Sequence, residues 1–190
     1  MFHLHPITAW NDYYSVNAQT NFDSQTYSSR QNPSNSYVYF SNCLFISISS
    51  TSGNGGALYC TSATYFLVES SSFVTCKTSG GYGGGIFFQN TGGQSVLYNV
   101  CGYDCCSTYS SGPHYQFAYL YVNNAATSKN YINYSSITRC VNEISNSHHM
   151  LYLFYGKICC PSINSSMNKC KYHSGIYCDS YADSNLVTGL

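Results

Sequence analysis

Residues 71–76 read Ser-Ser-Phe-Val-Thr-Cys, and the same pattern returns twice further along the chain. Residues 135–140 read Ser-Ser-Ile-Thr-Arg-Cys, and residues 165–170 read Ser-Ser-Met-Asn-Lys-Cys. A degenerate copy, Val-Cys-Gly-Tyr-Asp-Cys, occupies residues 100–105, and Asn-Cys-Leu-Phe at residues 42–45 stands one period before the first clear copy. Steps of roughly 28 to 35 residues are typical of stacked structural repeats.

Two further columns accompany this pattern. Gly-Gly-Ala-Leu-Tyr at residues 55–59 returns as Gly-Gly-Gly-Ile-Phe at residues 83–87, and an apolar stretch such as 65–68 or 131–134 precedes the Ser-Ser motif. Each period therefore contains three short strands. Glycine suits the corners between them, where a positive φ or a close approach of backbones is needed, and the predicted corner residues are Gly55, Gly56, Gly83 and Gly84.

The predicted fold is all-β, a right-handed parallel β-helix (solenoid) of about five coils with three short strands per coil. Such strands cannot bury their apolar faces alone, but stacked coils share one continuous core. We expect a cap or partly disordered lead-in at residues 1–36, the β-helix at 37–181 and a tail at 182–190. The repeat alignment places four cysteines in one column, namely Cys76, Cys105, Cys140 and Cys170.

Composition narrows the classes of function. The 190 residues suit one domain, and their 17% aromatic content argues against disorder. Only 7% of residues are charged, with seven basic against seven acidic, so a nucleic-acid partner is not expected. No apolar run is long enough to span a bilayer, so no transmembrane segment is expected in this chain. Residues 1–6 lack the basic and apolar regions of a secretory signal, which predicts either a cytosolic protein or a piece of a longer one.

The Gly-Gly-Ala-Leu-Tyr and Gly-Gly-Gly-Ile-Phe segments resemble the coils of pectin-lyase-like repeat proteins of the polymorphic-membrane-protein type. Versions rich in Ser, Asn, Tyr and Cys are similar to surface proteins of parasitic protists. The resemblance covers residues 40–105 well and extends to Tyr177 more weakly. It implies the β-helix fold, and it implies adhesion at the cell surface or after secretion, despite the missing signal.

The eleven cysteines leave three interpretations open. Recurrence once or twice per coil favours a ladder of buried thiols over disulfides, and an odd count leaves one thiol unpaired in any fully oxidised form. A metal site is the least favoured, because Cys101, Cys105 and Cys106 have a poor spacing for zinc. His3, His5 and the pair His148–His149 could bind a metal if brought together, but a structural or incidental role is preferred. No metal and no cofactor is predicted.

Enzymatic activity is the alternative function. Polysaccharide lyases of this fold use clustered acids and a basic residue, whereas hydrolases need paired carboxylates. The chain has five Asp and two Glu, scattered along its length. The repeat alignment nevertheless places Asp104, Arg139 and Lys169 at one position of successive coils, together with Thr75, and predicts an ion pair between Asp104 and Arg139. An exposed ion pair is preferred over a lyase-like site around Arg139.

Asn133 and Asn164 begin glycosylation sequons, which would fit a secretory route. The leading hypothesis is a noncatalytic surface or secreted β-helix protein that binds carbohydrate or a host surface protein through a Tyr- and Asn-rich face. The alternative is a polysaccharide lyase or hydrolase, active or degenerate, and a third reading makes the chain part of a longer solenoid.

Overall fold

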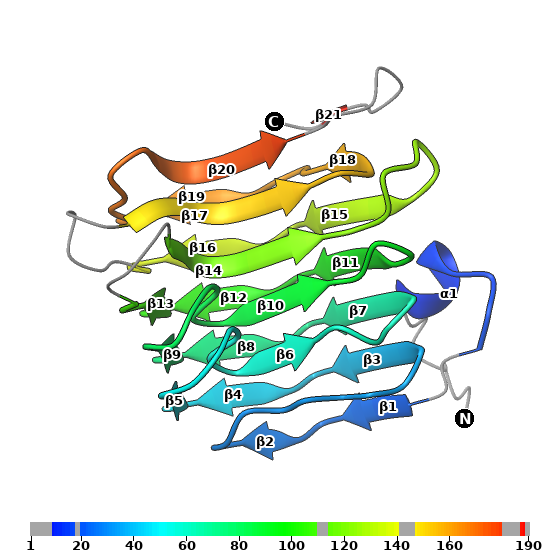
Figure 1. Ribbon diagram of the computed structural model, residues 1–190. Helices are drawn as coiled ribbons and strands as arrows, with labels where there is room; N and C mark the ends of the chain where they lie inside the picture. Colours follow the sequence, from blue (N-terminus) through cyan, green and yellow to red (C-terminus); the bar gives the residue numbers. More distant parts are fainter. Residues whose placement is uncertain (1–8, 18–19, 110–113, 141–146, 180–186, 189–190) are drawn as a thin grey trace, which may run out of the picture.

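The computed structural model describes residues 9–17, 20–109, 114–140, 147–179 and 187–188 (Figure 1). Only the backbone is described for four of them, residues 114, 147, 187 and 188. Within these ranges the chain is almost entirely β-strand, with one short helix, α1 (Ala9–Tyr13).

Four sheets make up the structure. Sheet A consists of β1 (Thr20–Asp23), β3 (Tyr37–Ser41), β7 (Tyr65–Glu69), β11 (Gln94–Tyr98), β15 (Lys129–Asn133), β18 (Lys157–Cys159) and β21 (Val187–Thr188). Sheet B consists of β2 (Thr26–Tyr27), β4 (Leu44–Ile46), β8 (Ser72–Val74), β12 (Cys101–Tyr103), β16 (Ser136–Thr138) and β19 (Asn164–Ser166). Sheet C consists of β6 (Leu58–Cys60), β10 (Ile86–Gln89), β14 (His114–Tyr121), β17 (Ser147–Phe154) and β20 (His173–Asp179). The small sheet D consists of β5 (Ser49–Ser50), β9 (Lys77–Thr78) and β13 (Cys106–Ser107).

Each strand pairs in parallel with the equivalent strand of the next coil. For example, β7 pairs with β3 on one side and β11 on the other, with Leu67 opposite both Tyr39 and Val96. This order confirms an all-β parallel β-helix. Parallel pairing begins before residue 37, because β1 and β2 pair in parallel with β3 and β4. Residues 20–27 therefore belong to a first coil that the prediction assigned to the lead-in.

Stacked aromatic rings fill the interior. Phe73 lies directly above Phe45, with ring centroids 4.5 Å apart and planes 2° from parallel, because the register of β4 and β8 places the two residues opposite each other. The next residue in this column is Gly102. A Cβ on Gly102 would lie 2.5 Å from the ring of Phe117, so the glycine leaves room for a phenyl ring that enters from sheet C.

Left-handed backbone conformations mark the corners of the coil. Thr75, Asp104 and Arg139 follow the strands of sheet B with φ values of 53°, 50° and 54°, and the strand register places them at the same position of successive coils. Gly55 and Gly83 have φ values of 71° and 69°. A positive φ at these two positions is a conformation that glycine adopts without strain.

Helix α1 covers the outer surface of sheet A and does not cap an end of the solenoid. Trp10 and Tyr14 pack against three outward-facing residues of β3, β7 and β11, which are Tyr39, Leu67 and Val96. Figure 1 shows the helix beside β7 and β11. The helix packs there because these outward positions carry large apolar side chains, which the helix removes from water. Among the described residues, no helix has the length and apolar character required to cross a bilayer.

Candidate functional site: the aromatic face of sheet C

An unbroken column of aromatic side chains runs along the outer surface of sheet C, from β6 to β20. We call this column the tyrosine face, and its members are Tyr59, Phe87, Tyr119, Tyr152 and Tyr177. Consecutive ring centroids are 5.5, 5.0, 5.4 and 5.3 Å apart, with planes within 9° of parallel. The spacing follows from the distance between paired strands, about 4.8 Å, because one ring occurs in each coil.

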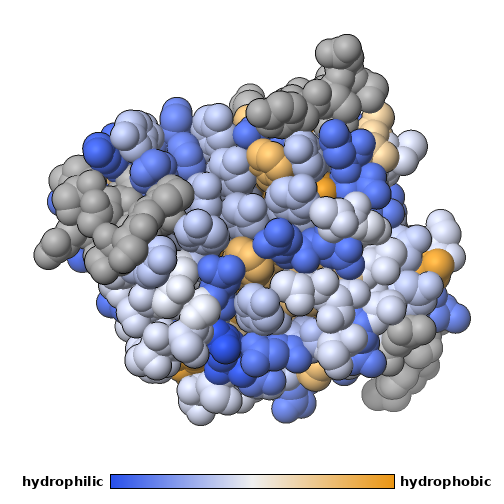
Figure 2. All heavy atoms as spheres, viewed as in Figure 1, coloured by the Kyte–Doolittle hydropathy of each residue, from blue (hydrophilic) through white to orange (hydrophobic). Residues whose placement is uncertain are grey.

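The stacking determines what this face offers a ligand. Ring faces are occupied by neighbouring rings. Phe87 and Tyr152 are buried, so the partly exposed rings of Tyr59, Tyr119 and Tyr177 are the ones whose edges and hydroxyl groups meet solvent. Burial, together with neighbouring tyrosines, raises the pKa of Tyr119 and of Tyr152, so these phenols keep their protons. The Tyr152 hydroxyl donates to Oδ2 of Asp179 at 3.2 Å. Figure 2 shows that the surface in this view is mostly pale or blue, with few orange atoms.

An open pocket of about 370 Å³ lies at the β6 end of the tyrosine face. Its walls are Arg30, Tyr59, Asn54, Gly53 and Ser52. The guanidinium carbon of Arg30 lies 5.7 Å from the centroid of the Tyr59 ring, a cation–π contact. Nη1 of Arg30 donates to the Ser52 carbonyl at 2.7 Å, so backbone groups fix the position of this cation.

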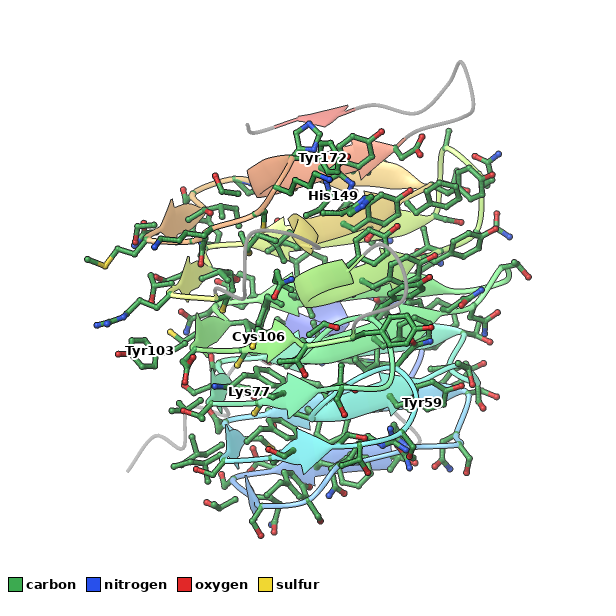
Figure 3. The ribbon with its side chains drawn as sticks, turned by 60° about the vertical axis from the view of Figure 1, so that its left-hand side comes forward. Tyr59, Lys77, Tyr103, Cys106, His149 and Tyr172 are labelled. Atoms are coloured by element: carbon green, nitrogen blue, oxygen red, sulfur yellow. The ribbon has the colours of Figure 1, made fainter. Side chains whose placement is uncertain are left out.

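Two histidines lie beside the tyrosine face at its opposite end. Nδ1 of His149 in β17 and Nδ1 of His173 in β20 are 2.8 Å apart. His149 also stacks on Tyr177, with centroids 4.4 Å apart. Burial, together with the neighbouring His173 and His148, lowers the pKa of His149 to about 4. Figure 3 shows Tyr59 and His149 at different levels of the stack of coils.

The residues of the proposed lyase-like column do not form a cluster. Asp104 pairs with Lys77, with Nζ and Oδ2 3.4 Å apart, and this is the one ion pair between side chains of the described residues. The guanidinium of Arg139 instead lies 5.8 Å from the centroid of the Tyr103 ring. The predicted Asp104–Arg139 pair is therefore wrong, because Lys77 on the preceding coil reaches the carboxylate. Figure 3 shows Lys77, Tyr103 and Cys106 together on one side of the molecule.

Lys169 does not share the position of Arg139. The register of β16 and β19 places Ser136 opposite Asn164, two residues away from the alignment of Ser-Ser motifs. Met167 consequently follows Arg139 in the column, and both have a left-handed backbone with φ of 57° and 54°. Lys169 lies exposed beyond that corner.

The cysteine column is present over three coils. The backbone N–H of Cys76 donates to Sγ of Cys105 at 3.4 Å, and the N–H of Cys105 donates to Sγ of Cys140 at the same distance. No disulfide joins any two of the eleven cysteines. The same two-residue shift takes Cys170 out of the column, and Asn168 lies there instead. Cys43 is also outside the column, since it lies opposite Ser71 and its N–H donates to the Ser71 hydroxyl at 3.0 Å.

The two sequon asparagines have opposite environments. Asn133 is 6% exposed, and its Nδ2 donates to the Tyr13 hydroxyl of helix α1 at 2.5 Å. A glycan on that nitrogen would displace the helix. Asn164 is exposed in β19, where its Nδ2 donates to the Ser136 hydroxyl at 3.2 Å.

Four of the described carboxylates each have different partners. Glu69 accepts hydrogen bonds from the Ala9 N–H and the Tyr39 hydroxyl, and Asp23 accepts from the Ser41 hydroxyl. Asp104 and Asp179 take part in the contacts given above. Over the part of the chain that the structure describes, no group of three or more His, Cys, Asp or Glu side chains is arranged to hold a metal ion.

The chain matches no known protein family, no curated protein and no solved structure. The class of protein is therefore defined by its architecture, a parallel β-helix with free buried thiols and an aromatic outer face.

Most members of this site were absent from the sequence prediction. The Gly-Gly-x-x-aromatic spacing includes Tyr59 and Phe87. Looser copies of that column at residues 115–121 and 150–154 include Tyr119 and Tyr152, but Tyr177 carries no such signal. Arg30 lies in a segment that has no repeat pattern. His173 lies opposite His149 because β17 pairs with β20, and no local sequence motif predicts that register.

Proposed function

We propose that this protein is a noncatalytic binding module that holds a carbohydrate chain along the tyrosine face, at a cell surface or after secretion. The observation that carries the proposal is the column of five aromatic side chains with centroids 5.0 to 5.5 Å apart. Four of the five are tyrosines, so the column repeats a hydroxyl group along its length. A polysaccharide repeats its own hydroxyls at a comparable interval.

The chemistry of the face supports a polyhydroxylated ligand over an apolar one. Phenol hydroxyls both donate and accept hydrogen bonds, and sugars present both kinds of partner. Arg30, Asn54 and Ser52 add polar groups at the β6 end, where a chain end would lie. Rings whose faces are already stacked leave hydrogen bonds and edge contacts as the means of recognition.

The lyase or hydrolase alternative has less support. A hydrolase needs two carboxyl groups about 5 to 10 Å apart around one bond, and a lyase needs a base beside an acidic cluster. The four carboxylates described above are distributed among separate contacts, and Arg139 lies over the Tyr103 ring. No observation in the structure favours catalysis at the column of Asp104.

A glycan array followed by a degradation assay tests the proposal. The intact protein is expected to retain one class of polysaccharide and to leave its chain length unchanged during prolonged incubation. Retention with release of unsaturated products or new reducing ends would favour the enzyme. Failure to retain any glycan above a denatured-protein control would overturn the binding proposal.

A further inference from the structure

The strongest unassigned feature is the contact between two imidazole rings on neighbouring strands. His149 and His173 occupy paired positions of β17 and β20, and their Nδ1 atoms are 2.8 Å apart. One ring must donate a proton and the other must accept it at this distance. The two nitrogens are therefore already brought together by the backbone register.

Aromatic neighbours hold the His149 ring in place. It stacks between Tyr115, at 5.6 Å and 13°, and Tyr177, at 4.4 Å and 18°. His149 is 9% exposed, whereas His173 is exposed. The His149 nitrogen is thus held by packing, and the exposed His173 ring lies against His149 and Tyr177, with centroids 4.8 and 5.0 Å apart.

We propose that His149 and His173 form a two-histidine site for a divalent transition-metal ion that prefers right-angled coordination, such as Ni²⁺ or Cu²⁺. Imidazole nitrogens bind such ions at about 2.0–2.1 Å, and two nitrogens 2.8 Å apart then subtend about 90° at the metal. That angle matches square-planar or octahedral ions and not tetrahedral Zn²⁺.

Proton balance is simple in this site. The ring that carries its proton on Nδ1 transfers it through water to its own Nε2, which leaves both Nδ1 lone pairs free for the metal. Both imidazoles stay neutral, so no net proton is released. Among the described residues no third His, Cys, Asp or Glu joins the pair, and water fills the other coordination positions.

Calorimetric titration with NiCl₂ tests the site, independently of carbohydrate binding. The background protein carries His3→Gln and His5→Gln, which removes the other closely spaced histidines near the start of the chain, and its thiols are kept reduced. We expect one Ni²⁺ per chain, which the His173→Gln variant loses. Loss is also expected for His149→Gln, and far-UV circular dichroism checks that both variants fold.

His148→Gln is the matched control. His148 precedes His149 in β17, but its ring contacts Tyr172, with centroids 4.7 Å apart, and we expect the variant to keep the single Ni²⁺. The ligand-field absorption of bound Ni²⁺ provides a second readout. The proposal is overturned if the background protein binds no Ni²⁺, if a folded His173→Gln variant still binds one equivalent, or if His148→Gln loses it.

Discussion

Cys140 is the last cysteine of its column, and Asn168 occupies the equivalent position in the next coil. Its Oδ1 accepts the backbone N–H of Cys140 at 2.8 Å, and its Nδ2 donates to the Ile137 carbonyl at 2.8 Å. In the coils before it, Cys105 makes the equivalent contacts, as Sγ accepts the N–H of Cys76 and donates to the Phe73 carbonyl. An amide and a thiol thus satisfy the same pair of backbone groups.

Because Asn168 and the cysteines have the same role, two substitutions of Asn168 should differ in their effect on the free energy of unfolding. Asn168→Ala leaves the N–H of Cys140 without its acceptor and should lower the free energy of unfolding by about 1–3 kcal/mol. Asn168→Cys restores a thiol and should recover most of the loss. Urea denaturation followed by fluorescence measures both, with the exposed Asn164→Ala as the control. Equal stability of the Ala and Cys variants would contradict the shared role.

Position 168 also explains why the strand register expected from the sequence differs from the observed one in the last coil. Early coils were predictable because Phe45, Phe73 and the Gly-Gly corners recur with constant spacing. In the last coil, the letters Ser-Ser-x-x-x-Cys favoured an alignment through Cys170, whereas the backbone pairs two residues earlier. The hydrogen bonds of Asn168 to the Cys140 N–H and the Ile137 carbonyl accompany that register, and an alignment on cysteines does not detect an asparagine in their place.

The functional face was harder to predict for a different reason. Tyr119, Tyr152 and Tyr177 lie on the outer surface of sheet C, but a sequence with 21 tyrosines does not say which of them lie outside the core. Helix α1 shows the same difficulty, since Trp10 resembles a core residue and is buried on the outside of sheet A. Orientation follows from strand register, which long-range pairing sets.

Gly102 is expected to be intolerant of a methyl group. Its Cβ would lie 2.5 Å from the buried Phe117 ring, and overpacking of this kind costs about 1–3 kcal/mol. Gly102→Ala should therefore lower the urea midpoint. Gly175→Ala provides the control, because a Cβ there meets nothing within 4 Å; a similar loss in both variants would mean that the Phe117 contact is not responsible.

The two sequons should differ when the protein passes through a glycosylating secretory pathway. We expect a glycan on Asn164, which is exposed, and none on Asn133, whose amide is buried against Tyr13. Peptide mass spectrometry after enzymatic deglycosylation in heavy-oxygen water identifies each site. A folded, secreted protein with Asn133 fully occupied would contradict the packing of helix α1 on sheet A.

The most direct measurement of the central claim removes hydroxyl groups from the tyrosine face and leaves its rings in place. The variant Tyr59→Phe/Tyr119→Phe/Tyr177→Phe keeps the stacked column, and calorimetry compares its affinity with that of wild type for an oligosaccharide selected on the array. Each lost hydrogen bond is worth about 1 kcal/mol, so the affinity should fall about fivefold per hydroxyl that contacts the ligand. Tyr134→Phe, at a 56% exposed tyrosine outside the column, should bind as wild type does. Unchanged affinity in the folded triple variant would contradict the claim that this face binds the carbohydrate.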